Sequence, residues 1–345
     1  MLLVAGVVTC IVTFAQDSPK TEEKAPFGPN ELAVVVNADD PLSVKIGDYY
    51  QKSRRIPDEN IIKINFTPGI RVMIERDFND IKKIVDEHTL PRVQAYAITW
   101  AEPHRVQCMS ITTAFAVGYD EAFCPSKVPC EATKWNVYFN SNSRRPFNDL
   151  KIRPTMAIAG LDFKAVKALI DRGVASDGTF PTGTGYLLST SDKERNVRSA
   201  IYPAIMQRMR GLLKMRLLQA DFIENQQDVL FYFTGLHDVP KIATNRYVPG
   251  AIADHLTSIG GRLTDSIQMS SLRWLEAGAT GSYGSVKEPC NVLEKFPNPA
   301  IVIERYFSGE SLIEAYWKSV AMPGQGIFIG EPLAAPFRLP SRKVQ

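Results

Sequence analysis

Histidine and carboxylate side chains stand at the ends of predicted strands in the second half of this 345-residue sequence. His237 and Asp238 follow one strand, Asp254 and His255 end the next, and Glu288 follows a third. A carboxylate beside an imidazole orients the ring and raises its basicity, an arrangement used in general acid–base catalysis. The same side chains can ligate a divalent metal. These five residues are therefore candidate catalytic residues of a hydrolase. The alternative is that they form turns, caps and ion pairs.

The sequence lacks the motifs of common cofactor sites. It contains no Gly-x-x-x-x-Gly-Lys phosphate loop, and no Gly-x-Gly-x-x-Gly follows its first predicted strand. No two of its four histidines form His-x-x-x-His, the helical motif of zinc peptidases. Gly281-Ser282-Tyr283-Gly284 misses the nucleophile elbow of hydrolases, because Thr280 stands where that motif has its first glycine. No cofactor is therefore predicted, apart from the divalent metal that the histidines and carboxylates could bind.

Cysteine spacing predicts a disulfide bond. Four of the five cysteines lie beyond residue 100. Cys124 and Cys130 flank the segment CPSKVPC, whose prolines favour a compact loop, so these two are expected to pair. Cys108 and Cys290 then form a second bridge or remain two free thiols, and a thiol peptidase that uses one of them is a further alternative. Paired structural cysteines are typical of oxidising compartments.

The elements that must hold these side chains alternate between strands and helices. Apolar runs predict strands, and apolar stripes at helical spacing predict helices. In the first half the order is strand, helix, strand, helix, strand, at residues 32–37, 43–54, 60–66, 75–88 and 93–100. That order indicates a parallel sheet with right-handed crossovers.

The alternation resumes after a loop-rich insertion at about residues 103–150. Asp162 is the expected N-cap of a helix over 163–172, and another helix is expected over 193–214. Further helices are expected over 267–277, 298–307 and 311–320, and further strands over 155–160, 185–189, 228–234, 249–258, 279–283 and 326–330. The predicted fold class is α/β, with a mostly parallel sheet that carries helices on both faces.

Open parallel sheets bind ligands at the carboxyl ends of their strands. Strands consecutive in sequence are neighbours about two-thirds of the time. We therefore expect His237 or Asp238 within reach of Asp254 or His255, with Glu288 or the nearby cysteine bordering the same depression. Because side chains alternate along a strand, Asp254 and His255 are expected to face opposite ways.

Composition and charge exclude several classes of protein. Hydrophobic residues make up 45% and charged residues 22% of the chain, which is typical of globular proteins. Lysine and arginine number 40 against 37 acidic residues, and a net charge of +3 is too small to predict nucleic-acid binding. Beyond the N-terminus no stretch reaches 18 apolar residues, so no transmembrane span is predicted.

The N-terminus predicts export. Residues 2–15 are uncharged and mostly apolar, and they are too few to cross a bilayer as a helix. A signal peptide is therefore predicted at 1–15, followed by a polar, disordered tether at 16–30. The expected location is periplasmic, cell-surface or secreted. The alternative is a buried N-terminal helix or strand.

Several motifs resemble those of an uncharacterised family of exported bacterial proteins. They are PGAIADHLTS (249–258), EAGATGSYGSVKEPCN (276–291), GESLIEAYWKSVAMP (309–323) and GEPLAAPF (330–337). The resemblance extends over nearly the whole chain beyond the predicted signal peptide. It implies export and no particular activity.

More distantly, the C-terminal half resembles the caspase-like fold of gingipain-type cysteine peptidases. Those peptidases have one strand that ends in Gly-His-Gly and a next strand that ends in the nucleophilic cysteine. Here FYFTGLHD (231–238) and ADHLTS (253–258) stand in those places, and the second contains no cysteine. The resemblance implies a caspase-like sheet that lacks the His–Cys pair.

Two α/β halves are predicted, at 31–150 and 151–337, the second of them caspase-like, with a tail at 338–345. The favoured interpretation is a non-catalytic surface or periplasmic module that binds a protein or a glycan, because nucleophile and cofactor motifs are missing. The alternative is a hydrolase, metal-assisted or not, that uses the five candidate residues.

Overall fold

The computed structural model describes residues 27–126, 128 and 130–339. The predicted signal peptide, most of the predicted tether and nearly all of the predicted tail lie outside these residues. The prediction extended the tether to Asn30, but the side chain of Phe27 is fully buried and residues Pro29–Glu31 form a turn of 3-10 helix. The packed structure therefore includes the last residues of that segment.

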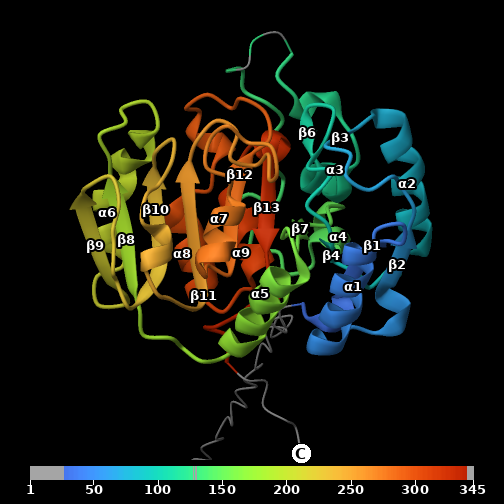
Figure 1. Cartoon of the computed structure of the whole chain (residues 1–345), viewed down its shortest axis with the longest axis horizontal. Coiled ribbons are helices and arrows are strands. Elements are labelled where there is room, and N and C mark those ends of the chain that lie inside the picture. Colours follow the sequence, from blue (N-terminus) through green and yellow to red (C-terminus); the bar gives the residue numbers. More distant parts are fainter. Residues whose placement is uncertain (1–26, 127, 129, 340–345) are drawn as a thin grey trace, which may run out of the picture.

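A ten-stranded sheet forms the centre of the molecule (Figure 1). The strand order is β2-β1-β4-β7-β13-β12-β11-β10-β8-β9. Neighbours within β2-β1-β4-β7 and within β12-β11-β10-β8-β9 pair in parallel, whereas β12 and β13 pair antiparallel. The bounds are β1 Leu32–Asn37, β2 Ile61–Ile64, β4 Ala95–Ile98, β7 Thr155–Ala157, β8 Thr184–Ser189, β9 Lys214–Gln219, β10 Val229–Gly235, β11 Tyr247–Leu256, β12 Gly281–Ser285 and β13 Gly326–Gly330. The α/β class and the mostly parallel sheet are confirmed.

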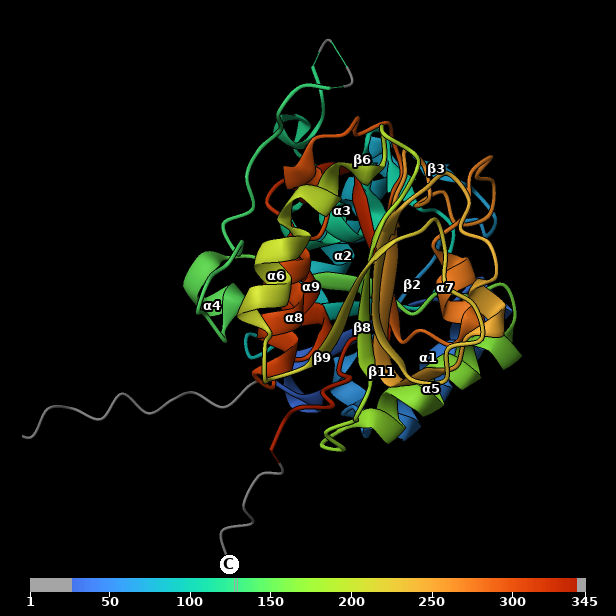
Figure 2. The same cartoon turned by 90° about the vertical axis from the view of Figure 1, so that its left-hand side faces the viewer.

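Helices cover both faces of this sheet. Figure 2 shows α1, α5 and α7 on one side and α3, α6, α8 and α9 on the other. No helix within the described ranges has the length and apolarity needed to cross a membrane. The bounds are α1 Pro41–Arg54, α2 Glu75–His88, α3 Ile111–Val117, α4 Pro146–Leu150, α5 Phe163–Ser176, α6 Tyr202–Arg208, α7 Leu272–Ala277, α8 Pro299–Phe307 and α9 Leu312–Ser319.

Two aspartates begin helices directly after strands. Asp40 caps α1 by accepting a hydrogen bond from the backbone N–H of Leu42, and Pro41 occupies the first helical position. Asp162 caps α5 in the same way, through the N–H of Ala165, as the sequence predicts. Asp40, which follows β1, therefore serves helix initiation.

The helix predicted over 193–214 is wrong. The structure has a 3-10 turn, Asn196–Ile201, and then α6, which ends at Arg208. Gly211, at φ +79°, reverses the chain, and β9 follows as the edge strand, parallel to β8. In β9 the apolar residues Met215, Leu217 and Leu218 are half-buried, whereas Lys214, Arg216 and Gln219 are exposed. Only Lys214 of β9 lies within the predicted helix, and the prediction assigned no strand to residues 215–219.

A small sheet lies beside α3, above the carboxyl ends of β1 and β4 (Figure 1). Its strands, in the order β3-β5-β6, are β3 Val72–Met73, β5 Arg105–Val106 and β6 Met109–Ser110. Two of these strands, β5 and β6, lie in the segment predicted as a loop-rich insertion, which also contains α3 and α4.

Candidate functional site

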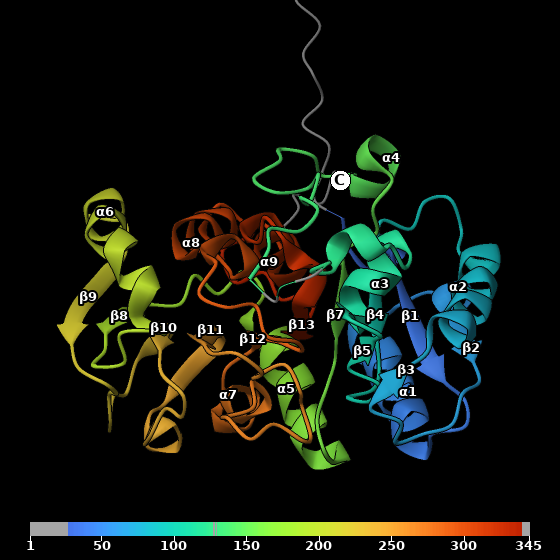
Figure 3. The same ribbon diagram turned by 90° about the horizontal axis from the view of Figure 1, so that it is seen from above.

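The strands that carry the predicted histidines are neighbours. β10 and β11 pair in parallel, with Thr234 opposite His255 and Gly235 opposite Leu256. The turn after β10 and the end of β11 therefore share the carboxyl edge of the sheet, which Figure 3 views from above. Met269 links the two, because its N–H donates to the carbonyl of His237 and its own carbonyl contacts the ring of His255.

Glycine allows the chain to pass closely at the end of β10. A Cβ atom at Gly235 would lie 1.8 Å from the carbonyl oxygen of Arg195, so any larger residue would displace that backbone. Thr190 fixes the same point by donating to the Gly235 carbonyl at 2.6 Å. Gly235 in the sequence TGLHD is therefore required for close packing. This packing places the segment around Arg195 at the carboxyl edge.

Asp254 is buried in an ion pair. Its side chain is 1% exposed and lies 2.6 Å from Nη2 of Arg198, which is 2% exposed. Arg198 also donates to the carbonyl of Thr234, at 2.7 Å. Burial raises the pKa of the Asp254 carboxyl, and the guanidinium of Arg198 opposes that rise. Asp254 is therefore held by the protein interior and does not face solvent.

His255 faces the other side of the sheet, as strand alternation predicts. Nε1 of Trp274 donates to its Nδ1 at 2.9 Å, and its Nε2 lies 3.1 Å from the carbonyl of Met269. An indole N–H can only donate and a carbonyl can only accept, so the proton of the ring sits on Nε2. Burial lowers the pKa of His255 to about 3. The ring is neutral, 2% exposed, and has both nitrogens engaged.

His237 and Asp238 form an exposed pair. Nδ1 of His237 contacts the carboxylate of Asp238, and the two side chains are 44% and 63% exposed. Because both side chains are open to solvent, this pair is not in the water-excluded surroundings that strengthen acid–base catalysis. The structure brings the turn close to His255 through Met269 but leaves the two rings in different surroundings.

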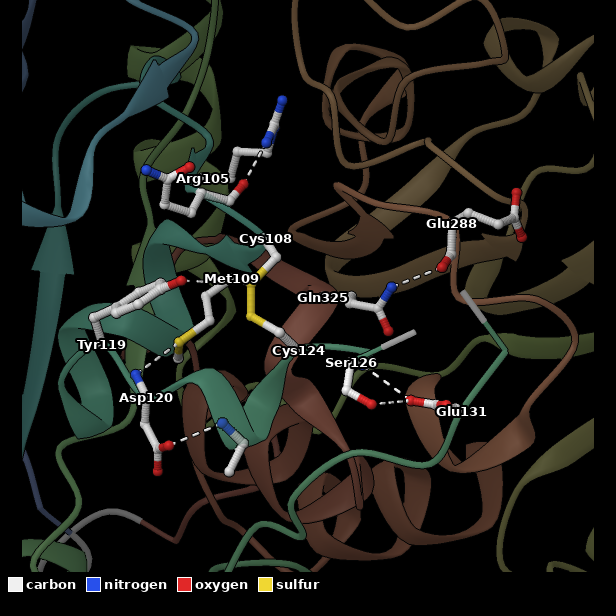
Figure 4. Close-up of a disulfide and its surroundings, with 12 residues drawn as sticks. Arg105, Cys108, Met109, Tyr119, Asp120, Cys124, Ser126, Glu131, Glu288 and Gln325 are labelled. Carbon is white, nitrogen blue, oxygen red and sulfur yellow. Dashed lines mark hydrogen bonds between the residues drawn. A yellow bond between two sulfur atoms is a disulfide. The ribbon is translucent and has the colours of Figure 1, made fainter. Parts of the chain in front are cut away.

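Glu288 and Cys290 border a depression at the same edge. Its volume is about 350 Å³. Oε1 of Glu288 accepts a hydrogen bond from the N–H of Cys290 at 2.8 Å, and Nε2 of Gln325 donates to the Glu288 carbonyl at 2.7 Å (Figure 4). The residues that line the depression are Cys130, Glu194, Arg195, Leu256, Ser258, Glu288, Cys290 and Asn291. Neither histidine of the prediction nor either aspartate lines it.

The predicted pairing of Cys124 with Cys130 is wrong. Cys124 bonds to Cys108, with their Cα atoms 5.8 Å apart, and Figure 4 shows this bridge. Cys130 bonds to Cys290, 160 residues along the chain, with Cα atoms 5.2 Å apart. The prediction relied on proximity in sequence. In the structure Cys130 instead bonds to a cysteine in the loop after β12, far along the chain. All four cysteines of the described residues are oxidised, so none of them is a thiol nucleophile.

We find no set of metal ligands within the described ranges 27–126, 128 and 130–339. They contain no group of three or more histidine, cysteine, aspartate or glutamate side chains placed to hold one ion. His255 fits this finding, because both of its ring nitrogens are used by Trp274 and Met269.

Sequence reasoning missed the arginines of this edge. Arg198 is the buried partner of Asp254, and Arg195 lines the depression and donates to Thr257 at 3.2 Å. A buried aspartate in an apolar strand requires a cation, so the sequence could have predicted a buried basic partner for Asp254. The sequence alone does not say which of its 40 lysines and arginines supplies it.

The comparisons with known proteins bear on the fold. No family model matches the chain, and no curated protein sequence matches it. A solved structure described as "Structure of Protease" is similar, with a TM-score of 0.50 and 9% sequence identity. The match covers 90% of this chain and 79% of that one. At this identity the likeness shows a shared α/β fold over most of the chain and leaves activity to the residues of the site.

Proposed function

We propose that this protein is an exported, non-catalytic binding module built on a caspase-like sheet, and that it binds a protein or a glycan at the carboxyl edge of that sheet. The two disulfides are compatible with an oxidising compartment. The likeness to a protease structure supports the fold, and the chemistry of the edge argues against a retained peptidase activity.

One observation carries the proposal. β11 ends where a caspase-like peptidase would hold its nucleophile, and the two residues there, Asp254 and His255, are both fixed in the interior. Neither can attack a substrate or exchange a proton with one. Of the five candidates for a hydrolase, only His237, Asp238 and Glu288 then remain accessible, and of these three Glu288 alone lines the depression described above.

The loops at this edge are braced in a way that suits recognition. The bond between Cys130 and Cys290 fastens two of the segments that line the depression. A surface that is rigid before binding loses less conformational entropy on association. The structure thus offers a fixed, polar hollow with Glu194, Arg195 and Glu288 at its wall.

Hydrolysis assays test the non-catalytic half of the proposal. The purified protein is incubated with a panel of peptide, ester and glycoside substrates, beside His237→Ala and the control His88→Ala. His88 is an exposed histidine at the end of α2. We expect no turnover above the blank in any of the three proteins. Turnover that falls at least tenfold in His237→Ala and stays unchanged in His88→Ala would establish the hydrolase instead.

Filling the depression tests the binding half. Asn291→Trp places a large ring at an exposed position of its wall, and Lys52→Trp does the same at an exposed position on α1, away from this edge. The three proteins are compared on an array of bacterial glycans and purified surface proteins. For each ligand that the unaltered protein binds, we expect Asn291→Trp to bind at least tenfold more weakly and Lys52→Trp to bind equally well. Equal binding by both variants contradicts a site in this depression.

A further inference from the structure

The loop after β11 crosses to the N-terminal half of the molecule. Thr264 donates a hydrogen bond to the carboxylate of Glu102, which lies just beyond β4. Nη1 of Arg71 lies 3.6 Å from Oδ2 of Asp265, and its Nε lies 3.8 Å from Oε1 of Glu102. The carboxyl ends of β4 and β11 thus meet at one edge, joined by a cluster of charged side chains.

Two further arginines enter this cluster without a carboxylate of their own. Nη1 of Arg105 donates to the carbonyl of Gln107 (Figure 4), and Nε of Arg262 donates to the carbonyl of Val286 at 3.4 Å. Within the described part of the chain, neither arginine has an acidic partner inside 4 Å. Burial, and then the nearby charge of Arg262, lower the pKa of Arg105. Arg105 follows Glu102 by three residues and Arg262 precedes Thr264 by two, so the hydrogen bond between Thr264 and Glu102 brings the segments of both arginines together.

Three polar atoms of the cluster are buried and have no hydrogen-bond partner. They are Nδ1 of His104, Nε of Arg105 and Oδ1 of Asp265. His104 is 1% exposed, and its N–H donates at 3.2 Å to the carbonyl of Arg71, the arginine whose guanidinium lies beside Asp265. A buried polar group without a partner costs about 1–3 kcal/mol, and nearly all such groups in proteins are satisfied. The cluster thus presents an unused donor, Nε of Arg105, an unused acceptor, Oδ1 of Asp265, and a ring nitrogen of His104 that donates or accepts according to its tautomer.

The net charge of the cluster selects a ligand with one negative charge. Arg71, Arg105 and Arg262 contribute three positive charges, and Glu102 and Asp265 contribute two negative ones, which leaves one positive charge. Burial lowers the pKa of the neighbouring His104 to about 4, so this ring is neutral at neutral pH. A guanidinium binds a planar carboxylate through paired hydrogen bonds.

We propose that this cluster binds a hydroxylated carboxylate, and that the ligand is an acidic sugar. The carboxylate would accept from Arg105 and Arg262, and a hydroxyl of the sugar would donate to Oδ1 of Asp265. A simple anion would satisfy the donors and leave the aspartate oxygen without a partner. The choice of a glycan rests on the proposed function, whereas the site itself rests on the charges and the unsatisfied atoms.

Calorimetric titration of the purified protein at constant ionic strength tests this site. The probes are sodium glucuronate, glucose, sodium acetate and N-acetyl-aspartate amide. We expect glucuronate to bind at least tenfold more tightly than acetate, because acetate lacks the hydroxyl, and glucose to show no binding. Arg105→Gln and Arg262→Gln should each weaken glucuronate binding at least tenfold. The control Arg76→Gln removes an arginine on α2 whose side chain is 80% exposed, and should leave binding unchanged.

Each other outcome overturns the assignment. No binding of glucuronate means that water satisfies the three buried atoms. Equal affinity for acetate means a site for any monoanion, and tighter binding of N-acetyl-aspartate amide means a site for acidic peptides. Melting curves of the two arginine variants show whether a loss of binding reflects unfolding. The hydrolysis assays are independent of these titrations, so failure here leaves the non-catalytic proposal standing.

Discussion

Nη2 of Arg198 lies 2.6 Å from the carboxylate of Asp254, and the two side chains are 2% and 1% exposed. Arg198 comes from the 3-10 turn before α6, and Asp254 comes from β11. The pair therefore fastens one of the covering layers to the centre of the sheet. The carboxyl end of β11 thus uses a charged side chain for packing.

Breaking this pair should destabilise the fold. Asp254→Asn leaves the guanidinium of Arg198 buried without a counter-charge, for which we expect a loss of about 3–5 kcal/mol in the free energy of unfolding. The double variant Arg198→Met with Asp254→Leu removes both charges and should recover most of that loss. Urea unfolding followed by circular dichroism measures both values. A loss below about 1 kcal/mol in Asp254→Asn contradicts a structural ion pair.

The two disulfides should differ in their contribution to stability. Cys130–Cys290 closes a loop of 160 residues and Cys108–Cys124 one of 16. By chain entropy alone these loops correspond to about 5 and about 3 kcal/mol. Serine at both positions of the long-range bridge should therefore cost more than serine at both positions of the short one. Denaturant unfolding compares the two double variants, and peptide mapping without reductant checks the pairing. A peptide that links Cys124 to Cys130 would refute both bridges.

The strand and helix order could be predicted because each element carries its own local signal. α1, α2 and α5 show apolar stripes, and Asp162 stands where an N-cap is needed. β9 escaped prediction because an edge strand buries only one side, and its mixture of charged and apolar residues also fits a helix. Pairing with β8 makes this segment a strand, and that pairing joins segments that are distant in sequence.

The site shows the same division between local and long-range information. Strand alternation predicts that Asp254 and His255 face opposite ways, and the structure confirms it. Their burial could not be predicted, because it depends on Arg198 and Trp274, which arrive from separate segments. The disulfide pairing failed for the same reason, since the partner of Cys130 lies 160 residues away.

Glu331 connects the two halves of the chain and should be sensitive to substitution. Directly after β13, its buried carboxylate accepts hydrogen bonds from the hydroxyl of Tyr50 at 2.6 Å and from Nε of Arg54 at 3.0 Å, both on α1. Arg54 pairs with two carboxylates, the fully buried Glu331 and the more exposed Asp177. Glu331→Gln keeps the shape but removes the buried one of these charges, so we expect a loss of about 3 kcal/mol in the free energy of unfolding.

Tyr50→Phe is the milder comparison for this network. It removes one hydrogen bond to the carboxylate and leaves the charges of Arg54 and Glu331 balanced, so the expected loss is about 1–3 kcal/mol. Chemical denaturation of both variants gives the comparison. If Tyr50→Phe costs more than Glu331→Gln, the charge balance is not the main contribution of this network.

Acidification should destabilise the protein through its buried histidines. Burial lowers the pKa of His255 to about 3, against about 6.5 for an unperturbed histidine. Between these values the unfolded chain binds a proton that the folded chain does not, so stability decreases as the pH falls through this window and is fully present above it. His104, with a pKa lowered to about 4, acts in the same direction. We expect His255→Gln to reduce the slope of stability against pH by up to about 1.4 kcal/mol per pH unit between pH 6 and 4.

Urea unfolding at several pH values measures this slope, with His88→Gln as the exposed control. The slope is compared rather than the absolute stability, because His255→Gln also loses the hydrogen bond from Trp274. An unchanged slope in His255→Gln would mean that His255 is protonated within the folded protein.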